Sequence, residues 1–142
     1  MDLKFLLYFS HALIDDDPHE HNKILQACHK RNVPIGLTGF LHREGDFFVQ
    51  YLEGPEDQLN NAMQRISKDP RHTDVQVAIE GPLEARQLPD WQMGFVNGEQ
   101  LSLIDVVGMR DGKLDIKSAD PWDLVEFVLE NADALSEQAL VA

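Results

Sequence analysis

The sequence predicts an α+β fold, a ferredoxin-like βαββαβ sandwich with an extra strand and a C-terminal helical appendage. Patterns typical of strands and helices follow one another in the order strand, helix, strand, strand, helix, and two further strand patterns come next. The 142 residues, 43% of them hydrophobic, suffice for one compact core. Because crossover connections in such sheets are right-handed, this order places the helices on one face of the sheet.

The first two elements are a buried strand and an amphipathic helix. Residues 3–10 form an apolar, aromatic run that ends before the turn-rich residues 15–18, as a buried strand does. In residues 20–31 a stripe of four residues then recurs at helical spacing, and Pro34 and Gly36 stop the pattern. The members of this helical stripe are Ile24, Ala27, Cys28 and Arg31.

A hairpin and a second helix follow. Residues 35–42 and 47–53 have the composition of strands, and the polar residues 43–46, which include a glycine, read as the turn between them. We expect Gly54 to cap the next helix and Pro55 to occupy its first turn. The apolar stripe of this helix is Leu59, Met63 and Ile66.

Two more strands complete the predicted sheet, and the remainder forms the appendage. Residues 75–79 alternate apolar and polar side chains, and so do the residues around Met93. We therefore divide the chain into a domain over residues 1–97 and a helical appendage over residues 98–142 that packs on it. The last helix is expected to begin at Asp120 and Pro121. Its apolar stripe is Trp122, Val125, Val128, Leu129, Ala132 and Leu135.

Composition excludes several classes of function. Twenty-five acidic against twelve basic residues give a formal net charge of -13, which repels nucleic acid phosphates and anionic membrane surfaces. Cys28 is the single cysteine, so an internal disulfide and a zinc site built from several thiolates are both ruled out. The sequence has neither an apolar run long enough to span a membrane nor a leader with a cleavage pattern, so a cytoplasmic location is expected.

Two polar residues stand where buried strands should be apolar. Gln50 shares a strand face with Phe48 and Leu52. A buried amide without partners costs about 1–3 kcal/mol, so Gln50 should be hydrogen-bonded. Tyr8 lies on the first strand, which neighbours the third in this fold, and a Tyr8–Gln50 contact is plausible. A tyrosine and a glutamine that are bonded in an ordinary core would give the same sequence pattern. Asn32, just beyond the first helix, is likewise typical of a helix end, because asparagine tolerates left-handed backbone angles.

Several separated motifs resemble the BLUF family over about residues 3–97. Their order and spacing carry the resemblance, since each motif alone is weak. The motifs are Tyr8-Phe9-Ser10; Ile24-Leu25 leading to Asn32; Gly36-Leu37-Thr38-Gly39; Phe48-Val49-Gln50 followed by Leu52-Glu53-Gly54; Asp69-Pro70-Arg71-His72; and Trp91-Gln92-Met93-Gly94-Phe95.

The resemblance implies a blue-light photoreceptor that is not an enzyme and binds a flavin non-covalently between the two helices. FAD is the usual cofactor, and FMN and riboflavin stay open. The implied photochemical switch consists of Tyr8, Gln50, Met93 and Trp91, although Trp91 and Met93 also fit the plain apolar face of a strand. The implied cofactor-binding residues are Tyr8, Ile24, Cys28, Arg31, Asn32, Leu41, Phe48, Gln50, Asp69, Arg71 and His72.

Two rival interpretations remain. His19, Glu20 and His21 near the aspartates at 15–17 offer metal ligands, but their spacing fits no catalytic zinc motif, and a solvated acidic loop is the better interpretation. A light-insensitive protein-interaction module with this fold is the more serious rival. For a photoreceptor we expect an unidentified downstream protein and self-association as the output, without direct binding to nucleic acid or membrane.

Overall fold

The computed structural model describes residues 2–89, 92–97, 102–103, 109–110, 113–114 and 116–130. Five strands form one sheet in the order β4-β1-β3-β2-β5, and β6 and β7 form a separate pair. Residues 121–130 are helical. The other elements are β1 (Leu3–Ala12), α1 (Pro18–Arg31), β2 (Thr38–Glu44), β3 (Phe47–Pro55), α2 (Glu56–Ile66), β4 (His72–Leu83), β5 (Gln92–Asn97), β6 (Met109–Arg110), β7 (Lys113–Leu114) and the short 3-10 helix η1 (Ile116–Ser118).

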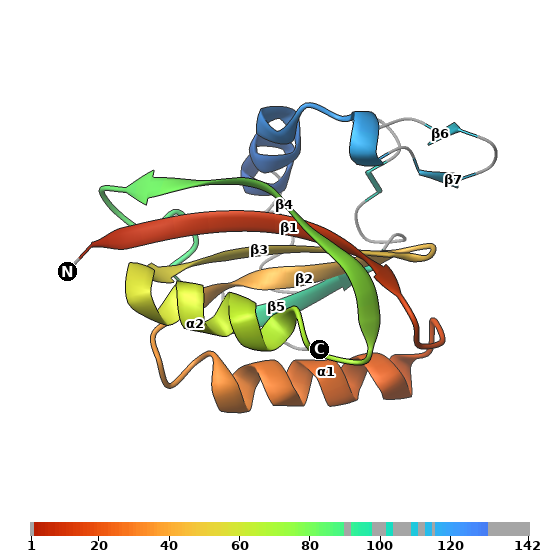
Figure 1. The fold of residues 1–142 in the computed structure, drawn as a ribbon, viewed down its shortest axis with the longest axis horizontal. Coiled ribbons are helices and arrows are strands. Elements are labelled where there is room, and N and C mark those ends of the chain that lie inside the picture. The colour runs from red at the N-terminus through yellow and green to blue at the C-terminus, as the bar shows by residue number, and fades with distance from the viewer. Residues whose placement is uncertain are drawn as a thin grey trace.

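The strand order confirms the predicted ferredoxin-like sandwich and its extra strand. β1 pairs with both β3 and β4 in antiparallel fashion at the centre of the sheet, while β5 pairs in parallel with β2 at one edge. α1 and α2 lie on one side of the sheet, and the described C-terminal elements lie on the other (Figure 1). The molecule thus has three layers, with the sheet in the middle.

The first helix begins earlier than predicted. The carboxylate of Asp17 accepts a hydrogen bond from the backbone N–H of His19 at 3.1 Å, and Pro18 occupies the first turn. A side-chain cap followed by proline is a strong start signal, which the apolar stripe alone did not reveal. The helix ends at Arg31, and Asn32 follows with right-handed angles (φ -95°, ψ -38°), so the expectation of a left-handed residue there is wrong.

The start of the second helix also differs from the prediction. Gly54 lies within β3 and does not cap α2, while Pro55 precedes the first turn, which begins at Glu56. Gly54 is required by close packing: a Cβ atom there would lie 2.6 Å from Leu37 Cδ2 and 2.8 Å from the carbonyl oxygen of Gly36. A glycine is therefore needed at this position because residues 36–37 pack closely against β3, and not because it caps a helix.

Two strands have different bounds from those predicted. β2 begins at Thr38, three residues after the predicted start, because the preceding residues form a turn in which Gly36 has a φ of +85°. β4 runs from His72 to Leu83, well beyond the predicted residues 75–79 at both ends. Its pairing with β1 contains register shifts, which interrupt the alternation that a sequence pattern relies on.

Apolar side chains fill both faces of the sheet. On the side of α1 and α2, Leu6, Leu52 and Leu59 are almost fully buried. On the other side, Leu7 and Tyr51 pack in one cluster with residues of the C-terminal segment. The buried members from that segment are Leu103, Ile116, Leu124, Val125 and Val128.

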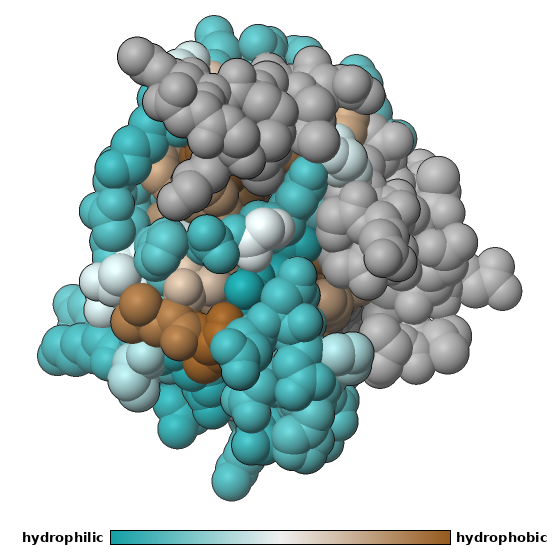
Figure 2. Space-filling view, turned by 90° about the vertical axis from the view of Figure 1, so that its right-hand side faces the viewer, coloured by the Kyte–Doolittle hydropathy of each residue, from teal (hydrophilic) through white to brown (hydrophobic). Residues whose placement is uncertain are grey.

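The stripe predicted for the last helix is only partly right. Val125 and Val128 are buried and Leu129 packs against the core, but Trp122 is 58% exposed and Leu124 takes the buried position. Ala132 and Leu135 lie outside the described residues. Hydrophilic residues cover most of the described surface in the view of Figure 2, where hydrophobic residues form a compact cluster at the lower left and also show above it.

Candidate functional site

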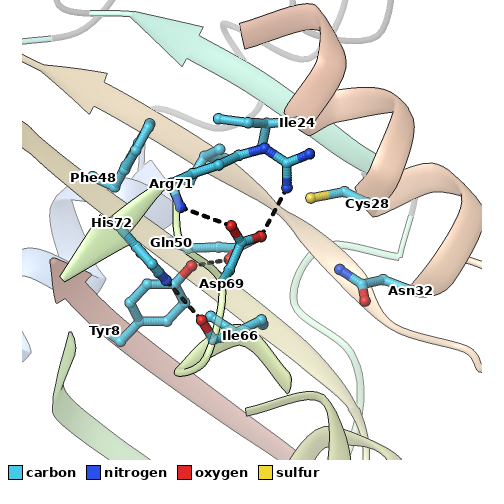
Figure 3. Close-up of a pocket in the computed structure, with 11 residues that line it drawn as sticks. Tyr8, Ile24, Cys28, Asn32, Phe48, Gln50, Ile66, Asp69, Arg71 and His72 are labelled. Atoms are coloured by element: carbon cyan, nitrogen blue, oxygen red, sulfur yellow. Dashed lines mark hydrogen bonds and ion pairs between the residues drawn. The ribbon is translucent and has the colours of Figure 1, made fainter. Parts of the chain in front are cut away.

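A cleft opens where α1 and the end of α2 face the sheet (Figure 3). Its outline takes in about 420 Å³, a volume that includes space open to solvent. Its walls combine apolar side chains with a few polar ones, as small-molecule sites usually do. The lining residues are Tyr8, Ile24, Cys28, Asn32, Leu41, Phe48, Gln50, Ile66, Asp69, Arg71 and His72.

Tyr8 and Gln50 form a buried hydrogen-bonded pair in the wall of this cleft. They stand directly opposite each other in the β1–β3 register, and the Tyr8 hydroxyl donates to Gln50 Oε1. Both side chains are at most 3% exposed. Burial raises the pKa of Tyr8 well above its ordinary value, and the nearby Cys28 and Asp69 raise it further. Tyr8 is therefore a neutral hydrogen-bond donor at any physiological pH.

Cys28 and Asn32 reach the same space from α1. The Cys28 thiol is hydrogen-bonded to Gln50, and burial raises its pKa to about 11 although this bond opposes the shift. The thiol is thus protonated and contacts the same amide as Tyr8 does. Asn32 is 2% exposed, and its Oδ1 accepts a hydrogen bond from the Arg65 guanidinium of α2.

His72 connects three elements around the cleft. Its Nε2 lies 2.7 Å from the carbonyl oxygen of Ile66, at the end of α2, and its Nδ1 lies 2.7 Å from Ser10 Oγ on β1. Since a carbonyl only accepts, Nε2 carries a proton, and in the neutral ring Nδ1 accepts from the Ser10 hydroxyl. The ring also meets Tyr8 edge-on, with centroids 6.1 Å apart.

Asp69 and Arg71 lie on the connection between α2 and β4. Asp69 accepts from the Arg71 backbone N–H at 2.9 Å and from its guanidinium at 2.8 Å. Arg71 also lines an outer extension of the cleft between the two helices, together with Arg31 and Arg65. Three guanidinium groups thus face one region of an otherwise strongly acidic protein.

The structure brings together almost all of the residues assigned from the resemblance. Ten of the eleven cofactor-binding candidates line the inner cleft, and Arg31 lines its outer extension. Trp91 lies outside the described residues, and of Met93 only the backbone position in β5 is described. Sequence reasoning missed Ile66, which its position in the α2 stripe assigned to the core, and Arg65, which follows no motif.

The acidic loop before α1 gathers no metal site. Within the described part of the chain, no group of three or more His, Cys, Asp or Glu side chains could hold an ion. His21, however, is not solvated as expected: it is 7% exposed and stacks on Phe95 at 4.8 Å. Burial lowers the pKa of His21, and Arg43, whose guanidinium is 3.5 Å away, lowers it further.

Similar proteins of known structure share this architecture. The dark-state structure of BlrB, a BLUF protein, superposes with a TM-score of 0.78 at 30% identity and covers 94% of this chain and 98% of that one. The photo-activated state of BlsA superposes with a TM-score of 0.76 at 20% identity, covering 92% of this chain and 94% of BlsA, and supports the fold alone.

Curated relatives match over part of their length. The beta subunit of the photoactivated adenylate cyclase of Euglena gracilis is 36% identical over 101 residues, which is 70% of this chain but 12% of that protein. The blue light- and temperature-regulated antirepressor BluF of Escherichia coli (strain K12) is 34% identical over 73 residues, 51% of this chain and 18% of that protein.

The model of one protein family covers β1 to β4, both helices, the first half of β5 and every residue that lines the cleft. It matches residues 3–94 under the description "Sensors of blue-light using FAD". This agrees with the expectation of a sensor domain without catalytic activity of its own. Among the described residues, no helix is long and apolar enough to cross a membrane. The chain therefore belongs to the BLUF family of blue-light sensors, whose cofactor is FAD.

Proposed function

We propose that the cleft between α1 and α2 is the FAD site, and that Tyr8 and Gln50 form its light-driven hydrogen-bond switch. The observation that carries this proposal is the buried Tyr8–Gln50 bond in the wall of a cleft lined by both apolar and polar side chains. When bound, FAD would supply the absorption of blue light and an electron acceptor beside Tyr8. The residues around it fit that group, because apolar walls suit a planar ring and the polar side chains suit its edge.

The chemistry of the switch lies in the two ends of the Gln50 amide. Its Oε1 accepts from Tyr8, while its NH₂ group is a donor. If the amide rotates or tautomerises, the bonds that it offers are reversed without any backbone movement. Cys28 can adjust to both arrangements, since a thiol is a weak donor and a weak acceptor. On oxidation Tyr8 would lose its phenolic proton, and Gln50 Oε1, to which its hydroxyl is bonded, is the acceptor in place.

The other assigned residues have supporting roles. Asn32, Asp69, Arg71 and His72 would hold the polar edge of the ring, and Ile24, Leu41 and Phe48 its apolar faces. Arg31, together with Arg65, would hold the phosphates, which favours FAD or FMN over riboflavin because the net charge of -13 otherwise repels them. These roles are supported by the position of the side chains around the cleft.

The response would leave the cleft through β5, where Met93 and the preceding Trp91 are the proposed relay residues. Downstream, we propose association with a partner protein or with a second copy of the chain, in the cytoplasm. The names of the relatives describe cyclase subunits and an antirepressor, so BLUF segments occur in longer proteins of different output. The residues of the cleft therefore do not indicate which downstream reaction or partner receives the signal.

Absorption spectroscopy of the purified protein tests this function. We expect flavin bands that shift reversibly to the red under blue light, and retention of the flavin without the normal shift in Tyr8→Phe and Gln50→Leu. Tyr51→Phe is the matched control, because Tyr51 lies on the opposite face of the sheet and bonds to Glu53. Its shift should equal that of the wild type.

Two results would contradict the proposal. A colourless protein that takes up no added flavin would favour the light-insensitive interaction module instead. An unchanged photocycle in both Tyr8→Phe and Gln50→Leu would refute the switch while leaving the cofactor in place. Titration with FAD, FMN and riboflavin, in the wild type and in Arg65→Ala, separates a phosphate-binding role of the arginines from a purely structural one.

A further inference from the structure

β5, like the inner strands of the sheet, contacts both layers of the molecule. On the side of the helices, Phe95 packs with Leu41 and Phe48, two residues that line the cleft. On the opposite side, its neighbour Val96 is fully buried in the cluster that contains Leu103. Two adjacent residues of β5 thus contact residues of the cleft wall on one side and the C-terminal layer on the other.

A fully buried carboxylate holds the segment that enters β5. Glu53 is 0% exposed and accepts four hydrogen bonds, two from side-chain hydroxyls and two from backbone N–H groups. The backbone donors are Gln87 at 2.9 Å and Leu88 at 2.6 Å. The hydroxyl donors are Thr38 and Tyr51, on β2 and β3. The sheet thus fixes the chain shortly before β5 begins.

A second carboxylate holds the segment that leaves β5. Glu44, on β2, accepts from the backbone N–H of Leu103 and from the Ser102 hydroxyl, each at 2.8 Å. His42, on the same face of β2, lies 3.0 Å from the same carboxylate. Leu103 is 1% exposed, so this contact anchors the chain after β5 to the core.

The two contacts share one design. Each uses a carboxylate of a central strand, on the face that meets the C-terminal layer, and each receives backbone N–H groups of a segment that flanks β5. Hydrogen bonds to an ionised acceptor are stronger than neutral ones. A carboxylate can only accept, so donor and acceptor cannot exchange roles in these contacts. The chain between them is held at both ends, and among the described strands β5 pairs with β2, at the edge of the sheet.

We propose that Glu44 and Glu53 are positioning residues for the light response: they hold the two ends of the β5 segment, so that a change at the cleft is passed to the C-terminal layer. The inference rests on the proposed light switch. Glu53 holds the end of the segment before β5, and Glu44 holds the end after it, at residues 102–103. The buried Leu103 packs in the same cluster as the helical residues 124, 125 and 128.

Hydrogen exchange of the flavin-bound full chain, in darkness and under blue light, tests the proposal. In the wild type we expect light to change amide exchange at Leu103 and in residues 116–130. In Glu44→Gln, exchange at Leu103 in darkness should rise about ten- to a hundredfold, as loss of a bond to a charged group implies. The light-induced change in residues 116–130 should fall to less than half, with the flavin red shift unchanged.

Glu53→Gln should raise exchange at Gln87 and Leu88 by a similar factor and also reduce the light-induced change in residues 116–130. Because Glu53 is fully buried and this variant risks misfolding, Tyr51→Phe removes one of its four donors as a milder test in the same direction. Ser102→Ala does the same for Glu44. The matched control is Glu84→Gln, an exposed glutamate that should change neither measurement.

The outcomes separate this inference from the proposed function. A red shift combined with an undiminished light-induced change in residues 116–130 of Glu44→Gln and Tyr51→Phe would overturn the positioning role alone. The same holds if light leaves the C-terminal exchange of the wild type unaltered. A wild-type protein without any red shift would overturn the proposed function, and the positioning role with it.

Discussion

The two faces of the sheet bury their polar groups in opposite ways. On the face of the helices, Gln50 and Tyr8 pair as neutral groups beside the cleft. On the other face of the same strand, Glu53 presents a carboxylate to four donors. A primary amide can exchange its donor and acceptor ends, whereas a carboxylate has only acceptors. One face is therefore suited to switching and the other to anchoring.

The largest expected effect is a difference in stability between the two faces. Glu53→Leu leaves four donors, three of them in buried hydrogen bonds, without their acceptor and should cost about 3–5 kcal/mol. Gln50→Leu mainly leaves the Tyr8 hydroxyl unpaired and should cost about 1–2 kcal/mol. Urea unfolding in darkness at one saturating flavin concentration measures both. If both variants lost the same free energy of unfolding, Glu53 would not differ from Gln50 in its contribution to stability.

The C-terminal layer offers a comparison within one helix. Leu124 is 1% exposed in the core, so Leu124→Ala should cost about 2–4 kcal/mol. Trp122 is 58% exposed and only approaches Phe5 at 6.2 Å between ring centroids, so Trp122→Ala should cost less than about 1 kcal/mol. Thermal unfolding of the two variants tests whether this layer is part of the cooperative fold, and a negligible loss for Leu124→Ala would show that it is not.

The face of the helices should lose stability at alkaline pH. The pKa of Cys28 is about 11 in the folded protein against an ordinary value of 9.0, because burial disfavours the thiolate. The unfolded chain therefore releases this proton first, and stability falls as the pH rises from 9 towards 11. Urea midpoints over that range should fall less steeply in Cys28→Ala than in the wild type. Parallel curves would show that burial of the thiol does not govern this dependence.

The opposite face should respond to acid, with a smaller effect. Burial alone would raise the pKa of Glu44, but the hydrogen bonds from His42, Leu103 and Ser102 outweigh it and lower that pKa below 4.5. A lowered pKa means that the contribution of Glu44 is present above 4.5 and is lost as the pH falls through the folded value. Amide exchange at Leu103, corrected for its intrinsic pH dependence, should thus accelerate below pH 4.5 in the wild type and not in Glu44→Gln.

The parts of the site that followed from the sequence are those fixed by strand geometry. The alternation along residues 47–53 and the adjacency of the first and third strands predicted the meeting of Tyr8 and Gln50. The remaining cleft residues came from the resemblance, because the approach of Ile24 and Asp69 to that pair depends on how the helices and the connection before β4 pack. Arg65 was missed for the same reason.

The anchoring carboxylates could not be predicted. Glu53 ends an apolar strand, where a charged residue usually marks the surface, and its burial depends on backbone N–H groups more than 30 residues later in the chain. Gly54 and Pro55 have the composition of a helix start, but the close approach of Leu37 decides the role of the glycine. These errors share one cause, since each depends on a neighbour that is distant in sequence.

The parallel pairing of β5 with β2 also orders events during synthesis. Gly39 pairs with Gln92, so the edge of the sheet exposed by β2 stays open until the intervening hairpin, helix and strand have left the ribosome. Contacts between such distant residues form slowly, because a long loop must close first. Phe95, which packs against Leu41 and Phe48 of the cleft wall, is therefore added to the fold after the rest of that wall has been synthesised.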